Sequence, residues 1–491
     1  MDMNKNNETK EVSTETEFNK LNIDNIDNID KKNCSYCDKP FNEKLWCKEC
    51  DPRHKIEGWT SGNNDIDKFI KDTIYDARKF NFNSFVEWIP FDRFENVEQI
   101  GDEYSKIYSA TWNDGQAIYT IQDDGSWRKL DPKPMKVALK RLNGSETITD
   151  ENLNEIKMHW ELYSRNNSFL EFYGISKDPE TKEFFVVIQF ANQRNLRYVL
   201  SNHFSTISWK EKINYLYGLA IDLKNLHEFG YYHKNVHSGN ILQDDGDSYL
   251  SNFEYSEPSN KQESDNKICC VLSYIAPEVL IGESYTLSSD IYSFGVIMAE
   301  ISSGKPPFYK RRHDANLASE ICNGIRPEFG RGTPEVYKKL AYKCMNADSN
   351  QRPTANELHE LLYFWRDSIN FYDKKYPVVE KFGYKEKEIN SIFKQANSVK
   401  LTNTNAYEKV PDVLYNSRVF TFNNLPKPIN SSIIITYLND DENKVRNYFI
   451  TSGKRAPSDA DFPFQLVHHE FPVRFSICYD NQQQMQAIKI L

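Results

Sequence analysis

Six short motifs follow one another in a fixed order along the middle of the chain. They are Lys-Val-Ala-Leu-Lys ending at Lys140, a helical pattern around Glu155, His-Lys-Asn-Val-His-Ser-Gly-Asn over 233–240, Ala-Pro-Glu ending at Glu278, Asp-Ile-Tyr-Ser-Phe-Gly over 290–295, and Arg352-Pro353. Each motif alone is a weak signal. Their order and spacing together are highly specific, and they mark residues 91–367 as one domain.

The stretch that carries these motifs changes in character along its length. Its first half reads as strands, and residues 184–190 form an apolar run as long as one buried strand. Residues 152–163 have the periodicity of a helix, and helical patterns dominate the second half as far as Trp365. We therefore expect strands mostly before helices.

The motif set resembles that of the eukaryotic protein kinase superfamily, in its tyrosine-kinase-like group. A pair of Cys-x-x-Cys motifs, the sequence over 87–101 and Phe-Asn-Asn-Leu-Pro-Lys-Pro-Ile-Asn-Ser over 422–431 further resemble a large fungal family of kinase-like proteins. The resemblance implies an α+β, two-lobed protein kinase fold, with a small β-rich lobe, a larger helical lobe and ATP between them.

Several nucleotide-binding positions of that family are present in this chain. By resemblance, Lys140 is the strand lysine that reaches the phosphates, Glu155 is its helix partner, and Asn240 is a ligand of Mg²⁺. The phosphate-covering loop departs from the family, because only Gly101 of its glycines remains and Glu103 and Ser105 stand at the other two positions. A carboxylate there would repel a triphosphate, so we expect weakened ATP binding.

The catalytic loop lacks its acid–base residue. Asn235 stands where the family has the catalytic aspartate. An amide can orient a hydroxyl group but cannot accept its proton. Loss of a positioned acid or base costs about 10²–10⁴-fold in rate, so Asn235 predicts an inactive catalytic position.

The metal-binding motif is altered as well, because Asp-Phe-Gly becomes Asn252-Phe253-Glu254. The amide of Asn252 offers a neutral oxygen, which is a weaker partner than a carboxylate for Mg²⁺. Glu254 removes the freedom of a glycine and adds negative charge, although its carboxylate is a conceivable surrogate ligand. We therefore expect Mg²⁺ binding at Asn252 to be impaired.

Three hypotheses follow from these departures. The first is a pseudokinase with weak or no phosphoryl transfer, which acts as a binding or allosteric module in intracellular signalling. The second is an active but atypical ATP-dependent protein kinase that uses Lys140, Asn240 and a surrogate carboxylate. The third is a scaffold that binds no nucleotide. The first is favoured, because three separate functional elements have changed while the scaffold motifs remain.

The resemblance also implies an intact scaffold. Glu278 and Arg352 are expected to form a buried ion pair, and Asp290 to cap the backbone of the catalytic loop. His233 and Phe253 are expected to pack in the spine between the lobes, and His237 is expected to be a packing residue of the catalytic loop.

A cysteine cluster precedes the domain. Cys34, Cys37, Cys47 and Cys50 form two Cys-x-x-Cys pairs separated by nine residues. This spacing lets four thiolates complete a tetrahedral shell around Zn²⁺, with no open position for water. The sequence therefore predicts a structural zinc knuckle over 34–54, the alternative being four free thiols.

The flanks of the domain differ in composition. Residues 1–33 are predicted to be a disordered polar tail, and 55–90 a linker with an amphipathic helix over 65–80. Residues 368–491 form a C-terminal extension of unknown fold, partly disordered. Within it, 381–394 is a candidate helix, while 431–438 and 471–479 are candidate strands.

Charge and hydropathy exclude several kinds of partner. The chain carries 61 Lys and Arg against 71 Asp and Glu, a formal charge of −10, which disfavours nucleic acid and anionic membranes. No apolar run approaches the roughly 20 residues of a membrane span, and the first residues lack the apolar region of a signal peptide. We expect a cytoplasmic protein whose partners are other signalling proteins, including an active kinase.

Overall fold

The computed structural model describes residues 41–43, 46–47, 60–80, 85–100, 107–116, 119–121, 127–129, 133–142, 144–165, 168–259, 268–370, 379–399, 415, 417–422 and 424–439. They divide into two compact units. Unit 1 draws on residues up to Glu95, on Thr111–Met135 and on Gly174–Lys177. Unit 2 draws on Asn96–Ala110, on Lys136–Tyr173 and on the residues from Asp178 onward, and it holds all six motifs.

Unit 1 contains the helix expected in the linker, α3 (Asn64–Phe80). The side chain of Asn63 starts this helix, because its Oδ1 accepts hydrogen bonds from the N–H groups of the second and third following residues, both at 3.0 Å. Ile66, Ile70 and Ile74 recur on one face and are buried. The amphipathic helix predicted over 65–80 is therefore confirmed.

The strands of unit 1 are short. They are β1 (Phe41–Glu43), β2 (Trp46–Cys47), β3 (Glu87–Trp88), β6 (Tyr119–Ile121) and β7 (Trp127–Lys129). β1 pairs with β2 and β6 with β7, both antiparallel, and β3 runs parallel to the end of β9. A side chain at Gly174 would collide with the carbonyl oxygen of Glu87, so the approach of β3 to β9 requires glycine.

Unit 2 holds most residues of five strands that pair in the order β9-β10-β8-β5-β4. These strands are β4 (Phe94–Gln99), β5 (Ile107–Trp112), β8 (Met135–Arg141), β9 (Phe172–Lys177) and β10 (Phe184–Gln189). β8 and β10 are antiparallel, with Lys140 opposite Val186 and Ala138 opposite Ile188. Residues 184–188 are all buried, which explains why this strand reads as a continuous apolar run.

Helix α4 (Asp150–Arg165) follows β8 and packs on the sheet. His159 and Trp160 both make edge contacts with Phe172 of β9, with ring centroids 5.2 and 6.1 Å apart. These contacts fix the face of α4 that carries Glu155, because residues i and i+4 lie on the same side of a helix. The helix predicted over 152–163 is confirmed.

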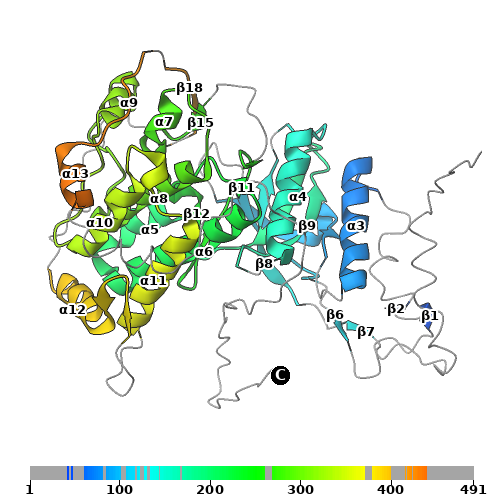
Figure 1. Ribbon diagram of the computed structural model, residues 1–491. Helices are drawn as coiled ribbons and strands as arrows, with labels where there is room; N and C mark the ends of the chain where they lie inside the picture. The colour runs from blue at the N-terminus through cyan, green and yellow to red at the C-terminus, as the bar shows by residue number, and fades with distance from the viewer. Residues whose placement is uncertain are drawn as a thin grey trace, which may run out of the picture. The chain divides into compact units, whose positions relative to one another are not determined.

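The rest of unit 2 is mainly helical. Its helices are α5 (Leu196–His203), α6 (Trp209–Glu228), α7 (Pro277–Leu280), α8 (Leu287–Ser303), α9 (Ala315–Cys322), α10 (Glu335–Cys344) and α11 (Ala355–Asn370). Figure 1 shows α11 running beside α6, and the two helices share an extensive contact. α8 is buried along nearly its whole length, so it forms the centre of this helical core.

Short antiparallel strand pairs connect the helices. They are β11 (Tyr231–Tyr232) with β14 (Glu257–Pro258), β12 (Ile241–Asp244) with β13 (Asp247–Leu250), and β15 (Ile268–Cys270) with β18 (Arg418–Phe420). The last pair joins two segments that are about 150 residues apart in sequence. A small β-rich part followed by a larger helical part agrees with the expected two-lobed fold.

The C-terminal extension contains β16 (Glu380–Lys381), β17 (Tyr384–Lys385), α12 (Glu386–Asn397), β18 and α13 (Ser432–Asn439). The strand predicted over 431–438 is wrong, because this segment is α13. Its β-branched residues suggested a strand, but Ile434 alone is buried while Ile433 and Ile435 are exposed. Packing of one helical face on α10 outweighs the local β-propensity. Residues 471–479 lie outside the described residues.

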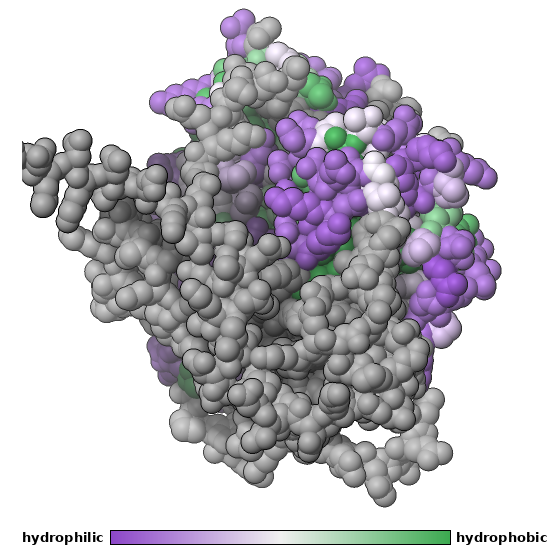
Figure 2. Space-filling view, turned by 90° about the vertical axis from the view of Figure 1, so that its right-hand side faces the viewer, coloured by the Kyte–Doolittle hydropathy of each residue, from purple (hydrophilic) through white to green (hydrophobic). Residues whose placement is uncertain are grey.

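The helices that the structure describes include none that is both long and apolar enough to span a membrane. The described residues on the face seen in Figure 2 are mostly hydrophilic, with hydrophobic side chains in small separate areas. Scattered apolar residues of this kind are ordinary on a protein surface and need no partner.

Candidate functional site

Three side chains from separate elements meet at Lys140. The ammonium group of Lys140, on β8, forms an ion pair with Glu155 of α4. Lys140 Nζ also donates a hydrogen bond of 2.8 Å to Oδ1 of Asn252, which follows β13. The structure therefore brings together three of the predicted nucleotide-site residues, with one carboxylate and one amide oxygen around the lysine.

The amide groups of the catalytic region contact one another. Nδ2 of Asn240 donates to the backbone carbonyl of Asn235 at 2.9 Å, and Nδ2 of Asn252 lies 3.5 Å from Oδ1 of Asn240. Asn252 has a φ of 68°, in the left-handed region that asparagine and aspartate both tolerate. The replacement of aspartate by asparagine at this position therefore needs no change of backbone.

This arrangement fits a nucleotide better than it fits a magnesium ion. Lys140 supplies the cation that a phosphate needs. The two positions expected to hold Mg²⁺, Asn240 and Asn252, offer neutral amide oxygens, and the Oδ1 of Asn252 already accepts a hydrogen bond from Lys140. Mg²⁺ favours carboxylates and phosphate oxygens, so the two amides by themselves do not fit a magnesium site.

Glu254 stands close to this cluster. Loss of hydration around its carboxyl group raises the pKa of Glu254, and the negative charge of Glu155 adds to that effect, while Lys140 opposes it. The residue as a whole is exposed. Glu254 therefore adds a carboxylate that is sensitive to the charge of Lys140, at the position that glycine takes in the Asp-Phe-Gly motif.

Asp290 at the start of α8 holds the catalytic loop in place. Its carboxylate accepts hydrogen bonds from the backbone N–H groups of His233, at 2.8 Å, and Lys234, at 3.2 Å. Burial alone would raise the pKa of Asp290, but hydrogen bonds from His227 and the loop backbone hold that pKa below its ordinary value. The prediction that Asp290 caps the loop backbone is confirmed.

A second ion pair ties the helical core together. Arg352 binds Glu278 through two hydrogen bonds, of 2.6 Å and 2.7 Å, and both residues are buried. Arg352 also donates to the carbonyl of Ser288 and, through Nε, to that of Asn346. The predicted pair of Glu278 with Arg352 is confirmed, and its bidentate geometry is the strongest that these groups form.

A cluster of aromatic rings links the catalytic loop to α4. The ring of Phe253 lies 5.4 Å from that of His233 and 5.6 Å from that of His159. Burial lowers the pKa of each histidine to about 4, so both are neutral at pH 7. The ring contact between His233 and Phe253 agrees with the expected packing of both residues.

His237 has a packing role. Its Nδ1 accepts a hydrogen bond from the N–H of Gly239 at 3.1 Å, and its ring lies 5.8 Å from that of Tyr274. Burial lowers the pKa of His237 well below its ordinary value. A ring buried among such partners agrees with the expected packing role of His237 in the loop.

Ser417 is a site residue that the sequence reasoning missed. Nδ2 of Asn235 donates to Ser417 Oγ at 3.0 Å, and Oδ1 of the same amide lies 3.3 Å from that hydroxyl. The two residues are 182 positions apart. A serine just before a short strand carries no local signal, so only the neighbouring resemblance over 422–431 drew attention to this part of the tail.

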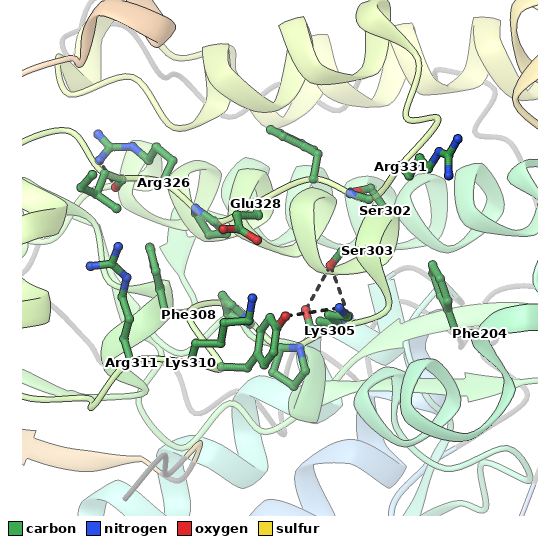
Figure 3. A pocket seen from close by; sticks show the side chains of 17 residues that line it. Phe204, Ser302, Ser303, Lys305, Phe308, Lys310, Arg311, Arg326, Glu328 and Arg331 are labelled. Atoms are coloured by element: carbon green, nitrogen blue, oxygen red, sulfur yellow. Dashed lines mark hydrogen bonds between the residues drawn. The ribbon is translucent and has the colours of Figure 1, made fainter. Parts of the chain in front are cut away.

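A pocket of about 610 Å³ lies elsewhere in unit 2. Figure 3 shows its lining, which comes from Phe204, from the end of α8 with the following residues up to Arg311, and from 325–331. None of the residues that gather around Lys140 lines it. This pocket is therefore distinct from the nucleotide site that the motifs indicate.

Two predicted sites fall outside the described residues. Gly101 is one such residue, as are Cys34, Cys37 and Cys50, and Cys47 lies in β2 without a described side chain. Among the residues that the structure describes, no group of three or more His, Cys, Asp or Glu side chains is arranged to hold a metal ion. The zinc knuckle therefore stays a prediction.

Several curated proteins resemble this chain. A putative serine/threonine-protein kinase/receptor of Acanthamoeba polyphaga mimivirus is 29% identical over 252 residues, which covers 50% of this chain and 15% of the relative. A probable serine/threonine-protein kinase of Dictyostelium discoideum is 27% identical over 293 residues, covering 56% and 15%. A probable LIM domain-containing serine/threonine-protein kinase of the same organism is 24% identical over 310 residues, covering 61% and 46%.

The match therefore spans less than half of each of these relatives, and their activities as whole proteins do not transfer with it.

A family model adds a match across the region that holds the motifs. The model for protein tyrosine and serine/threonine kinases matches residues 96–362, more than half of the sequence. The chain belongs to the protein tyrosine and serine/threonine kinase family.

Proposed function

We propose that this family member is a pseudokinase of the tyrosine-kinase-like group, with weak or no phosphoryl transfer. The observation that carries the proposal is the arrangement of amides at the catalytic positions. Asn235 holds a serine hydroxyl without a group that accepts its proton, and Asn252 is hydrogen-bonded to Lys140. Both positions keep their place in the fold and lack the charge that phosphoryl transfer uses.

The size of the effect supports this function over an active enzyme. Loss of the acid–base residue alone costs about 10²–10⁴-fold, or about 3–5 kcal/mol of barrier. Loss of the metal carboxylate removes a second contribution to the lowering of the barrier. The two losses are not additive, because the acid–base residue and the metal ligand act as a unit. The charge of Lys140 acts on the carboxyl group of Glu254, which favours the second candidate, an atypical kinase that uses Glu254 as a surrogate carboxylate.

We further propose that the chain acts in the cytoplasm as a binding or allosteric module for other signalling proteins, including an active kinase. The intact framework around the altered positions supports this role. Asp290 and Glu278 keep their partners, and Lys140 keeps Glu155. The zinc knuckle of Cys34, Cys37, Cys47 and Cys50 is proposed as a structural element, since four thiolates leave no site for chemistry.

A nucleotide titration of the full chain tests the proposal. The thermal unfolding midpoint is measured with ATP, with and without Mg²⁺, for the wild type and for Asn252→Asp. We expect a small shift in the wild type that Mg²⁺ does not enlarge, and an added Mg²⁺-dependent shift in Asn252→Asp, because the new carboxylate supplies the missing metal contact. Lys140→Met is the matched control and should lose the ATP shift in both backgrounds.

Each other outcome favours a different function. Phosphate transfer from labelled ATP that disappears in Lys140→Met would overturn the pseudokinase proposal and establish an atypical kinase. A large Mg²⁺-dependent shift in the wild type would point the same way, and its loss in Glu254→Gln would identify the surrogate carboxylate. An absence of any shift, with or without Mg²⁺, would favour a scaffold that binds no nucleotide.

A further inference from the structure

Part of the C-terminal extension lies on the segment that follows the catalytic loop. β18 pairs antiparallel with β15, and the register places Arg418 opposite Cys270 and Phe420 opposite Ile268. Figure 1 shows the two labelled strands side by side. β15 belongs to the stretch between Asn252 and Glu278, which is the activation loop by its position between these two motifs. An extended peptide that adds a strand to such an edge gains affinity from main-chain hydrogen bonds.

The hydroxyl of Ser417 lies directly before this strand pair. It makes two contacts with the side-chain amide of Asn235, at 3.0 and 3.3 Å. Asn235 stands where a kinase aspartate would accept the proton of a substrate hydroxyl. The tail therefore places a serine where an acceptor serine would stand, beside an amide that cannot remove its proton.

An aromatic anchor holds the tail on the other side of Ser417. The hydroxyl of Tyr415 donates to the carbonyl of Pro307 at 3.0 Å, and its ring lies 4.9 Å from that of His313. The guanidinium of Arg197 lies 5.0 Å from the centre of the ring and donates to the carbonyl of Tyr415 at 3.1 Å. Cation–π and aromatic contacts of this kind give a binding pocket its preference for tyrosine.

Arg197 also connects this anchor to the catalytic loop. Its Nε donates to Ser238 Oγ at 3.2 Å, and the hydroxyl of Ser238 donates to Glu300 at 2.8 Å. The anchor for Tyr415 is thus supported by buried polar groups of the loop and of α8. Side chains fixed by such partners lose little entropy when a ligand binds, which favours a preformed site.

The tail continues across the helical core after β18. The N–H of Ile429 donates to the carbonyl of Cys322 at 2.9 Å, and Asn430 accepts from the N–H of Ala347 at 2.8 Å. The hydroxyl of Tyr437 on α13 donates to Glu335 at 2.8 Å. These contacts hold the tail near its site, so binding within one chain benefits from a high effective concentration.

We propose that β15, Asn235 and the pocket around Arg197 form a binding site for an extended peptide with the pattern Tyr-x-Ser-Arg-Val-Phe, and that residues 415–420 are its resident ligand within the same chain. The site excludes other peptides while the tail occupies it. The proposal rests on the proposed function in treating the site as one for binding and not for phosphorylation. A partner enters only when the tail is displaced.

A backbone substitution in the tail of the full chain tests this proposal. Val419 lies in β18 with 60% of its surface exposed, so its side chain contributes little packing. Val419→Pro removes a backbone N–H and disfavours the strand conformation. The matched control Val419→Thr keeps the N–H and favours the strand. We expect amide hydrogen exchange of 268–270 to become at least about tenfold faster in Val419→Pro and to stay unchanged in Val419→Thr.

The second readout is peptide binding without nucleotide. A fluorescein-labelled peptide with the sequence of 413–424 should bind Val419→Pro at least about tenfold more tightly than it binds the wild type, because its site is then open. The same peptide carrying Ser417→Val should bind Val419→Pro more weakly than the unchanged peptide does. Tyr415→Ala gives a second opened chain, which keeps the test decisive if the proline variant does not fold.

Other results would overturn the proposal. Equal binding of the peptide to the wild type and to both opened chains would show that the tail does not cover the site. Binding no stronger than that of a scrambled peptide would show that the tail contacts are only packing. Because no ATP is present, these results are independent of phosphate transfer, and the proposed function stands or fails by its own titration.

Discussion

The scaffold and the catalytic elements of this kinase-family chain differ in where carboxylates are kept. Glu278 and Asp290 bind partners inside the protein, a guanidinium and two backbone N–H groups. Asn235 and Asn252 stand where a carboxylate would act on a substrate or on a metal. The fold therefore needs charge where that charge is paired within the chain, while amides satisfy the same backbone at the catalytic positions.

The largest expected effect concerns the scaffold carboxylate. Glu278→Gln leaves the buried Arg352 without its counter-charge, and we expect the free energy of unfolding in urea to fall by about 3–5 kcal/mol. The control is Glu320→Gln, which breaks the exposed pair of Glu320 with Arg311 and should cost less than about 1 kcal/mol. Similar losses in both variants would contradict this distinction, since the buried pair would then contribute no more stability than the exposed pair.

The second prediction concerns pH. The pKa of His233 is lowered to about 4 in the folded chain by burial, against about 6.5 when unfolded. A lowered pKa means that the stability is present above pH 6.5 and is lost as pH falls toward 4, by about 3 kcal/mol for this group. We therefore expect the unfolding free energy, measured in urea from pH 7 to pH 4, to fall steeply.

Two variants isolate the contribution of His233. His233→Phe cannot take up a proton, so its deficit relative to the wild type should shrink as the pH falls. His203→Gln, at an exposed position, should follow the wild-type profile throughout. If the unfolding free energies of His233→Phe and wild type fall in parallel with pH, the lowered pKa of His233 is contradicted. The loss of stability in acid would then come from carboxylates.

The smallest expected effect tests the carboxylate that the catalytic region has gained. Loss of hydration raises the pKa of Glu254, so its charge opposes folding at pH 7 and that cost disappears once the group is protonated. Glu254→Gln should raise stability at pH 7 by less than about 1 kcal/mol and have no effect near pH 3.5. Destabilisation at pH 7 would instead mean that Lys140 uses this carboxylate.

The sequence predicted the helix and strand that carry the ion pair at Lys140 and the packing roles of Phe253 and His237. These predictions worked because short motifs fix local backbone conformation and because α4 directly follows β8. The strand predicted over 431–438 was wrong, because a run of β-branched residues favours a strand locally. That local preference does not reveal whether another helix offers a surface on which the segment can pack as a helix. α13 forms because Tyr437 reaches Tyr342, with ring centroids 4.7 Å apart, and Glu335 on α10.

What the sequence determined by itself is which chemical group stands at each catalytic position. Motif order and spacing assign Asn235 and Asn252 to those positions, and the identity of an amide is visible without coordinates. Only the tertiary structure decided that Ser417 meets Asn235 across 182 residues and that β18 completes a pair with β15. Contacts between residues so far apart in sequence depend on the tertiary fold that closes the long loop between them. The hydrophobic periodicity of the sequence reports only local structure and does not predict such contacts.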